Sequence, residues 1–251
     1  MPGASVRAGA GALSFLTRVP IGRVITVDGS DVARGAIAFP LVGAGVGAVS
    51  GAVAVGAGHV LPPFVAAALA VALAAVLTGC MHLDALADTA DAFGASGRER
   101  ALEIMRDSRI GSFGATALAL DLLVKVGCIA QLVDRGHALA ALIAAGALSR
   151  AVSPPLAALL PYPRAGGGPG SVLAGRTPRL AAFVAAGLGA AISLLAWWGM
   201  GGVWLVVAAA TVAVVLGLWY LRWLGGATGD CLGAATELAE TAVLVVAAAL
   251  V

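Results

Sequence analysis

Three aspartates in the first half of the chain have a spacing that suits a metal site. Asp84, Asp88 and Asp91 occupy positions i, i+4 and i+7 of the run H-L-D-A-L-A-D-T-A-D. On an α-helix these positions project within about 60° of one another, so the carboxylates would share one face. Carboxylates this close repel one another unless a cation holds them, and Mg²⁺ is a hard cation that prefers oxygen ligands. The spacing predicts a Mg²⁺ site, whereas a solvated helix end would explain the charge but not the shared face.

A second acidic group lies near the C-terminus, in residues 228–240. Asp230, Glu237 and Glu240 occupy positions i, i+7 and i+10, again close to one helical face. Two glutamates at the start of an apolar segment are costly unless they have partners. A favourable charge at a helix N-terminus would account for Asp230 and Glu237, but less well for Glu240, which is one turn deeper. We therefore expect this group to have a functional role.

The segment 98–109 carries seven charges in twelve positions. Two of them, Arg106 and Arg109, just precede a predicted span. One guanidinium group can bind two phosphate oxygens at once. Amides at a nearby helix N-terminus would assist. The alternative is a solvated helix with intrahelical pairs such as Glu103–Arg106. The residues predicted to bind substrate or phosphate are Arg106, Asp107, Ser108, Arg109 and His82.

Carboxylates for Mg²⁺ and arginines for phosphate together predict phosphoryl transfer. The sequence has neither the G-x-x-x-x-G-K-[ST] loop of P-loop ATPases nor a G-x-S-x-G elbow. Three further charges lie within apolar stretches, namely Asp121 and Lys125, spaced i, i+4, and Arg150. Charges inside a membrane are candidates for function, and structural pairing, as between Asp121 and Lys125, is the alternative.

Composition indicates which kind of element must carry these residues. The 251 residues are 61% apolar and 11% charged, with a net charge of +2, whereas soluble domains carry about 25% charged residues. This deficit excludes a soluble domain, a disordered chain and a nucleic-acid partner. It predicts an all-α fold, a polytopic transmembrane helix bundle that forms a single domain over residues 1–251. The 35 glycines would let its helices pack closely.

Seven apolar stretches are long enough to cross a bilayer, which needs about 20 residues. They are 35–57, 62–80, 111–133, 138–160, 181–199, 203–221 and 232–251, with a polar segment at 82–110 and a Gly- and Pro-rich loop at 161–180. With the N-terminus in the cytoplasm, 12 of the 15 basic residues fall on the cytoplasmic side, in agreement with the positive-inside rule. Both acidic segments, 82–110 and 228–240, then face the cytosol.

Five blocks of the sequence resemble, in the same order, the cobalamin synthase family, the adenosylcobinamide-GDP ribazoletransferases of bacterial vitamin B12 assembly. The blocks are F-L-T-R-V-P (15–20), F-P-L-V-G (39–43), L-T-G-C-M-H-L-D-A-L-A-D-T-A-D-A-F (77–93), R-E-R-A-L-E-I-M-R-D-S-R-I-G-S-F-G (98–114) and L-G-G-A-T-G-D-C-L-G-A-A-T-E-L-A-E (224–240). The resemblance covers essentially the whole chain. The family often has glycine where this chain has Ala85 and Ala92.

The resemblance implies a concrete reaction. A ribose hydroxyl of α-ribazole, or of α-ribazole 5′-phosphate, attacks the diphosphate of adenosylcobinamide-GDP. The cobinamide-linked phosphate is transferred and GMP leaves, which forms adenosylcobalamin or its 5′-phosphate late in vitamin B12 biosynthesis. The resemblance further implies Mg²⁺ as cofactor and a multi-pass location in the bacterial cytoplasmic (inner) membrane, with the active site facing the cytosol. Its partners would be the two substrates, the lipid bilayer and other late cobalamin-assembly enzymes.

Under this hypothesis the acidic residues take specific roles. The metal ligands would be Asp84, Asp88, Asp91, Asp230 and Glu237. The catalytic residues would be Asp84, Asp88, Asp91 and Glu240, with Asp91 or Glu240 as the acceptor of the hydroxyl proton. Arg106 and Arg109 would clamp phosphates.

Two other functions remain open at this point. A CDP-alcohol phosphotransferase performs the same chemistry on a lipid, but is expected to carry a D-G-x-x-A-R motif; here Asp88 is followed by Thr89-Ala90-Asp91. An ion-coupled transporter would use intramembrane charges as a relay. The relay residues would be Asp121, Lys125, Arg150 and Glu240. The lack of a visible repeat and the gathering of acids on one side argue against a transporter.

Overall fold

The computed structural model describes residues 3–107, 109–164 and 169–251, and about four-fifths of them lie in helices. The predicted all-α fold is confirmed, since these residues contain no strand. The α-helices are α1 (Ala4–Leu16), α2 (Gly29–Gly35), α3 (Phe39–Gly58), α4 (Pro63–Thr78), α5 (Met81–Phe93), α6 (Arg98–Ile104), α7 (Ser112–Asp134), α8 (Ala138–Leu159), α9 (Arg179–Ala196), α10 (Met200–Leu224) and α11 (Gly229–Ala249). Short 3₁₀ turns lie at Ile21–Arg23, Ala36–Ala38 and Pro169–Val172.

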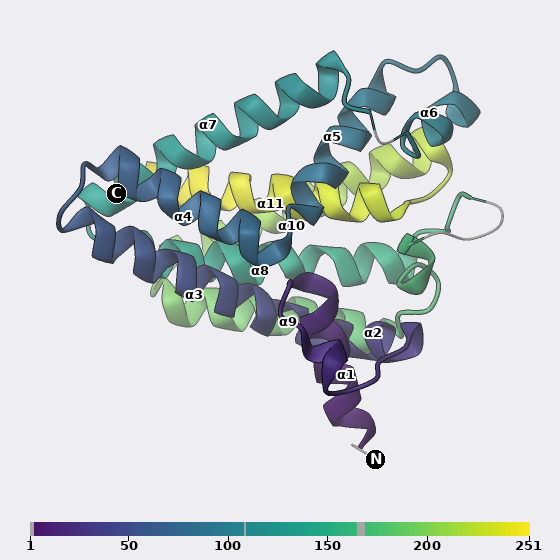
Figure 1. The fold of residues 1–251 in the computed structure, drawn as a ribbon, viewed down its shortest axis with the longest axis horizontal. Helices are drawn as coiled ribbons and strands as arrows, with labels where there is room; N and C mark the ends of the chain where they lie inside the picture. Colours follow the sequence, from purple (N-terminus) through teal and green to yellow (C-terminus); the bar gives the residue numbers. More distant parts are fainter. Residues whose placement is uncertain (1–2, 108, 165–168) are drawn as a thin grey trace.

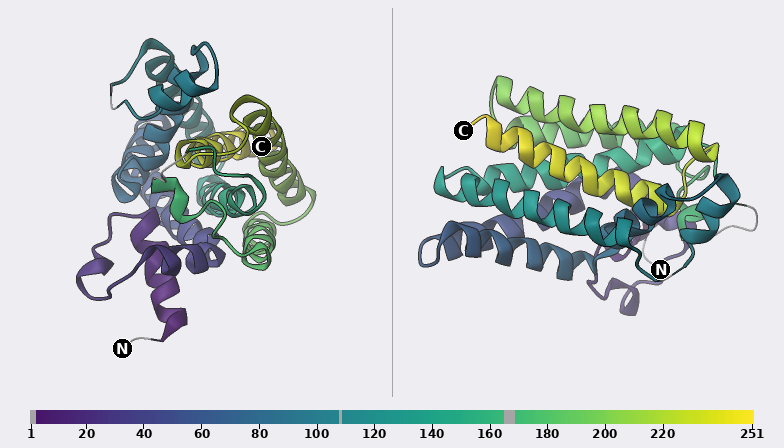
Figure 2. Two further views of the ribbon diagram at one scale, coloured as in Figure 1. Left: turned by 90° about the vertical axis from the view of Figure 1, so that its right-hand side faces the viewer. Right: turned by 90° about the horizontal axis from the view of Figure 1, so that it is seen from above.

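The long helices run back and forth along the long axis of the molecule, and α5 and α6 lie toward one end of it (Figure 1, Figure 2). In the described chain, six segments are long and apolar enough to cross a membrane: Gly29–Gly58, which joins α2 to α3, and each of the helices α7 to α11. Helix α4 makes a further run and forms a bent pair with α5. These elements confirm the prediction of about seven spans.

The predicted second span, 62–80, ends in a sharp bend. Helix α4 ends at Thr78, α5 begins at Met81, and the two helices meet at 90°. Gly79 and Cys80 both have left-handed backbone angles, with φ values of 64° and 59°. A residue in this conformation commonly ends a helix, and two in succession redirect the chain. Helix α5 therefore runs across the bundle rather than along it (Figure 1).

Helices α8 and α11 form the centre of the bundle, since they are far more buried than α7, α9 and α10. Helix α3 packs against α8 through glycines. A Cβ on Gly43 would overlap the carbonyl oxygen of Gly146, and a Cβ on Gly47 would overlap that of Leu142. Small residues permit this backbone contact between membrane helices. The prediction that glycines serve close packing is confirmed at this interface.

The N-terminal segment supports the bend between α4 and α5. The N–H of Arg18 donates a hydrogen bond of 2.8 Å to the carbonyl oxygen of Leu77. The Arg18 side chain also lies against Gly79, so closely that a Cβ at that position would overlap it. The F-L-T-R-V-P block, through Arg18, thus holds the start of α5 in place.

The segment that follows this block has an ion pair of its own. The buried carboxylate of Asp31 pairs with Arg34 at 2.6 Å.

Candidate active site

Two predicted aspartates of α5 meet the predicted aspartate at the start of α11. The helices touch where Ala85 faces Gly233, because a Cβ on Gly233 would overlap the Cβ of Ala85. This contact brings Asp84 near Asp230, and both residues line one cavity of about 190 Å³. Asp88, one turn after Asp84, is close enough to both that their charges act on it. This region of the bundle therefore gathers three carboxylates from the two predicted acidic groups.

The negative charge around Asp88 is poorly balanced. Burial, followed by the charges of Asp84, Asp230 and Asp91, raises the pKa of Asp88 to about 7. The positive charge of Arg164 opposes this shift but does not cancel it. A carboxyl group with such a pKa exchanges its proton near neutral pH, and its charged form is stabilised by a nearby cation.

Asp230 forms an ion pair with Arg164, a residue that no motif in the sequence marked. Arg164 donates from Nη2 to Oδ2 of Asp230 at 2.7 Å, and the Arg164 side chain is only 6% exposed. Thr228, which caps the start of α11, also donates to Asp230, at 3.3 Å. Arg164 lies in the Gly- and Pro-rich connection that was predicted to be a loop. The one sequence feature that could have identified Arg164 as a partner of Asp230 is that both residues are predicted to lie on the same side of the membrane.

Asp91 is engaged at the start of α7. Its Oδ2 accepts a hydrogen bond from the N–H of Gly111 at 2.7 Å, and its Oδ1 accepts one from the N–H of Gly114 at 2.8 Å. The first N–H groups of a helix have no partner within the helix. A Cβ on either glycine would overlap the Asp91 carboxylate, and at Gly114 it would also come within 2.9 Å of the carbonyl oxygen of Ala87. Asp91 therefore caps α7, and the close approach of α5 explains the glycine at position 114.

Arg106, Asp107 and Arg109, three of the residues predicted to bind substrate or phosphate, lie in the connection between α6 and α7. Arg109 pairs with Asp107 at 2.5 Å, and its side chain is 87% exposed. The hydrogen bonds from Arg109 lower the pKa of Asp107 to about 2. Arg106 is exposed, and Ser108 lies outside the described residues. The exposed arginines are available to a ligand that arrives from solvent, but they do not line the cavity that contains Asp84 and Asp230.

Helix α6 carries mostly solvated charges. Arg100 pairs with Glu103 at 2.7 Å, and both side chains are more than half exposed. The prediction of a charged helix with intrahelical pairs is thus confirmed for α6, although Glu103 takes Arg100 rather than Arg106 as its ion-pair partner. Arg98 donates to the carbonyl oxygen of Pro163 at 3.2 Å and ties α6 to the connection that follows α8.

His82 lines the same cavity as Asp84 and Asp230. Its side chain is buried, and burial lowers the pKa of His82 to about 3, so the imidazole is neutral. Within the described part of the chain, its Nδ1 finds no hydrogen-bond partner. The cavity therefore contains a neutral buried polar group in addition to its two carboxylates.

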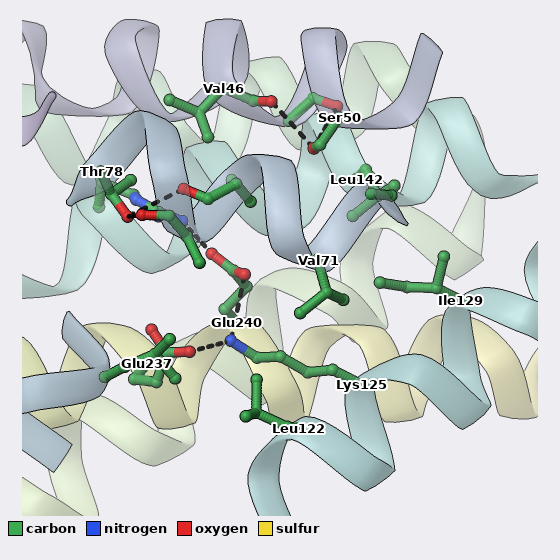
Figure 3. Close-up of a pocket in the computed structure, with 17 residues that line it drawn as sticks. Val46, Ser50, Val71, Thr78, Leu122, Lys125, Ile129, Leu142, Glu237 and Glu240 are labelled. Carbon is green, nitrogen blue, oxygen red and sulfur yellow. Dashed lines mark hydrogen bonds and ion pairs between the residues drawn. The ribbon is translucent and has the colours of Figure 1, made fainter. Parts of the chain in front are cut away.

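Glu237 and Glu240 belong to a separate cluster within the bundle. Lys125 on α7 donates to Glu237 and, at 3.2 Å, to Glu240, while Arg150 on α8 donates to Glu240. Asp121 lies 3.6 Å from Lys125, which confirms the predicted pairing of these two residues. Figure 3 shows Lys125 reaching from α7 toward both glutamates of α11. The intramembrane charges are thus paired with one another.

This buried ion cluster, made of the five residues just named, ties α7, α8 and α11 together. Each of its side chains is at most 14% exposed, and removing one partner from such a group leaves a buried charge unpaired. A cavity of about 40 Å³, large enough for ordered water, lies beside the cluster, and residues of α3, α4, α7, α8 and α11 line it (Figure 3). Mutual pairing accounts for the residues that were considered as a transport relay.

The described residues include no group of three acidic, histidine or cysteine side chains placed to hold a metal ion by themselves. Mg²⁺ seldom requires one, because it keeps waters and is usually held by one or two carboxylates together with substrate phosphates. Asp84 and Asp230 offer such carboxylates to one cavity, beside the unbalanced charge at Asp88. These residues fit Mg²⁺ bound together with a phosphate substrate. Both carboxylate oxygens of Asp91 and Oε1 of Glu237 are hydrogen-bonded elsewhere.

Known proteins are similar to this chain over almost its full length. A family model described as cobalamin-5-phosphate synthase matches residues 9–248. An adenosylcobinamide-GDP ribazoletransferase of Shigella boydii serotype 4 is 41% identical over 234 residues, which cover 91% of this chain and 94% of that protein. The protein of the same name from Escherichia coli O17:K52:H18 is 42% identical, with the same coverage. No solved structure matches the chain.

Proposed function

Because the chain belongs to the cobalamin-5-phosphate synthase family, we propose that it catalyses the reaction for which its relatives are named. A ribose hydroxyl of α-ribazole, or of its 5′-phosphate, attacks the phosphorus that carries the cobinamide in adenosylcobinamide-GDP. The bond from this phosphorus to the bridging oxygen breaks and GMP leaves. The new phosphodiester is that of adenosylcobalamin or its 5′-phosphate. Such a displacement depends on positioning and charge neutralisation more than on a strong nucleophile.

One observation carries this proposal beyond the sequence match. Asp84 and Asp88 from α5 and Asp230 from α11, which are far apart in the chain, converge near one cavity with Arg164 beside them. Carboxylates that accept Mg²⁺ next to a buried guanidinium are the groups that a diphosphate substrate needs.

Each residue of this site has a separate role in the proposed reaction. Asp84 and Asp230 would hold Mg²⁺, which when bound neutralises charge on the diphosphate oxygens. Asp88 accepts the hydroxyl proton on a carboxylate oxygen, because a pKa near 7 suits a general base at neutral pH. Arg164 keeps the Asp230 carboxylate oriented. Arg109, together with Arg106, contacts phosphate groups from the solvent side.

Asp91 and Glu240 were the earlier candidates for the proton acceptor, and both are assigned positioning roles in this proposal. The Asp91 carboxylate already accepts two hydrogen bonds from the start of α7. Glu240 is paired with Lys125 and Arg150 in the buried ion cluster. A carboxylate engaged in this way would have to lose a partner before it could approach a substrate hydroxyl.

The proposal extends to the location of the enzyme. The chain is a multi-pass membrane protein by its apolar helices, and its relatives are bacterial. We place it in the cytoplasmic membrane with its N-terminus and its acidic cavity on the cytosolic side. The support is the distribution of basic residues, 12 of 15 of which lie on that side in this orientation.

The decisive experiment measures GMP release by the full-length protein in membranes, with adenosylcobinamide-GDP, α-ribazole and Mg²⁺. Wild type should release GMP only when both substrates are present, and Asp88→Asn should be slower by about 100-fold or more. The matched control is Asp134→Asn, at the far end of α7, which should match wild type. No GMP from wild type would overturn the proposed reaction, and full activity of Asp88→Asn would overturn the role of Asp88.

A further inference from the structure

The cavity beside the acidic residues is mostly apolar. Its volume is about 190 Å³, whereas a pocket that encloses a whole drug-sized ligand usually measures about 300–1,000 Å³. Its apolar walls include Phe15 and Phe39, whose rings are stacked with centroids 5.8 Å apart and planes at 12°. Leu173 and Leu232 contribute further apolar surface. Such a cavity suits one flat, apolar ring system and is too small for a corrinoid.

A buried polar atom in this wall lacks a partner. Nδ1 of His82 has no hydrogen-bond partner among the described residues, although the side chain is only 4% exposed. A buried polar group without a partner is costly, so such atoms in native proteins usually meet a water or a ligand. The walls of the cavity are thus apolar, and one unpaired imidazole nitrogen is buried within the residue His82 that forms part of them. At its edge are the carboxylates of Asp84 and Asp230.

We propose that this cavity binds the base of α-ribazole, the nucleoside that accepts the transferred phosphate; this inference rests on the proposed function. The base is a benzimidazole with two methyl groups. It is flat and apolar, and once one ring nitrogen carries the ribose, the other is left as a single hydrogen-bond acceptor. A rotation of the His82 ring would turn the matching N–H into the cavity, and the stacked phenylalanines supply an apolar, aromatic wall. The attached ribose then lies toward Asp84 and Asp230, beside the reacting phosphate.

The guanine of the donor substrate fits the same cavity poorly. Guanine carries several donors and acceptors on its edge, and each would need a partner when buried. His82 and Ser153 are the uncharged polar side chains that the described lining offers. The Ser153 hydroxyl already contacts Thr236 and the carbonyl oxygen of Leu232. The lining therefore favours the acceptor base over the donor base.

The proposal is tested by measuring KM separately for α-ribazole and for adenosylcobinamide-GDP. Leu173→Trp fills the cavity with apolar atoms and should raise KM for α-ribazole by about tenfold or more, with KM for adenosylcobinamide-GDP within about twofold of wild type. The control, Leu180→Trp, makes the same change at a side chain that is 78% exposed, and should match wild type for both substrates. An unchanged KM for α-ribazole, or a raised KM for the donor alone, would overturn the proposal.

A second measurement uses the wild-type protein and does not depend on a variant folding. Free 5,6-dimethylbenzimidazole should inhibit competitively against α-ribazole and not against adenosylcobinamide-GDP. Competition with the donor, or no inhibition up to the solubility limit, would contradict the assignment.

The His82 nitrogen is tested by a pair of substitutions. His82→Leu should raise KM for α-ribazole, and His82→Gln, which keeps a hydrogen-bond donor, should recover part of the loss. Equal effects of the two variants would exclude the hydrogen bond. Because GMP release by wild type tests the reaction itself, failure of the cavity assignment stays distinct from failure of the proposed function.

Discussion

The carboxylate of Asp91, on α5, accepts a hydrogen bond of 2.7 Å from the backbone N–H of Gly111, and thereby defines where α7 begins. A second hydrogen bond, from Gly114, completes the cap. The pair joins the helix that carries the cavity aspartates to the first membrane span that follows it. An acidic residue chosen for its place in a metal-binding pattern therefore serves as a helix cap that holds α5 and α7 together.

This cap predicts a steric effect at Gly114. A Cβ at this position would collide with the Asp91 carboxylate and come within 2.9 Å of the carbonyl oxygen of Ala87. We expect Gly114→Ala to lower the free energy of unfolding by about 1–3 kcal/mol, measured by thermal unfolding in detergent. The control is Gly127→Ala on the same helix, where a Cβ meets nothing within 4 Å; it should be neutral or slightly stabilising. Equal effects of the two substitutions would contradict the predicted collision.

Asp91 and Asp88 should respond differently to the same chemical change. Asp91→Asn weakens a charge-assisted cap and should cost about 1.5–3 kcal/mol of stability. Asp88→Asn removes a charge that its neighbours repel, so it should leave the unfolding temperature unchanged or raise it while GMP release falls. Unfolding temperatures and turnover measured on both variants check this. A large loss of stability in Asp88→Asn would show that Asp88 is structural.

Lys125 should be among the residues least tolerant of substitution. Its ammonium group pairs with Glu237 and Glu240 inside the bundle. Lys125→Met would leave these carboxylates short of a counter-charge and should cost about 3–5 kcal/mol. The double variant Lys125→Met/Glu237→Gln removes one of the stranded charges and should regain part of the loss. The readout is the fraction of folded protein after heating in detergent; a double variant no better than the single one would contradict the argument.

The rate of GMP release should depend on pH through Asp88. Burial and the neighbouring carboxylates raise its pKa to about 7, and only the deprotonated form accepts a proton. At Mg²⁺ concentrations far below saturation, where the metal-free enzyme predominates, we expect kcat/KM to fall about tenfold for each pH unit below 7 and to level off above it. A pH–rate profile between about pH 5.5 and 8.5 measures this. A flat profile over this range would rule out Asp88 as the proton acceptor.

Arg164 should matter for activity although no motif marks it. Its guanidinium group, mostly buried, holds Asp230 at 2.7 Å. Arg164→Ala should lower kcat/KM about tenfold or more, because Asp230 loses its partner, and Arg164→Lys should restore activity only in part. Arg176→Ala, at an exposed arginine of the same connection, is the control and should match wild type. An active Arg164→Ala variant would show that the ion pair is dispensable.

The sequence by itself was enough to determine the class of fold and the gathering of acidic residues. Apolar runs of about 20 residues predict spans because the bilayer is a uniform solvent for them, and the structure has about seven. The Asp121–Lys125 pair was also predictable, since residues four apart on one helix are neighbours whatever surrounds them. The near-full-length family match gave the same function as the motifs.

Only the tertiary structure decided which carboxylates share a site. Helical spacing puts Asp84, Asp88 and Asp91 on one face, but the packing of α7 against α5 engages Asp91 as a cap. The spacing on α11 likewise groups Glu237 with Asp230, yet the two residues lie in different surroundings, because two helical turns separate the buried ion cluster from the cavity. The period of a helix is a local property of the chain. The bend at Gly79 and Cys80 and the rotation of each helix about its axis depend on contacts between distant segments, which no local pattern contains.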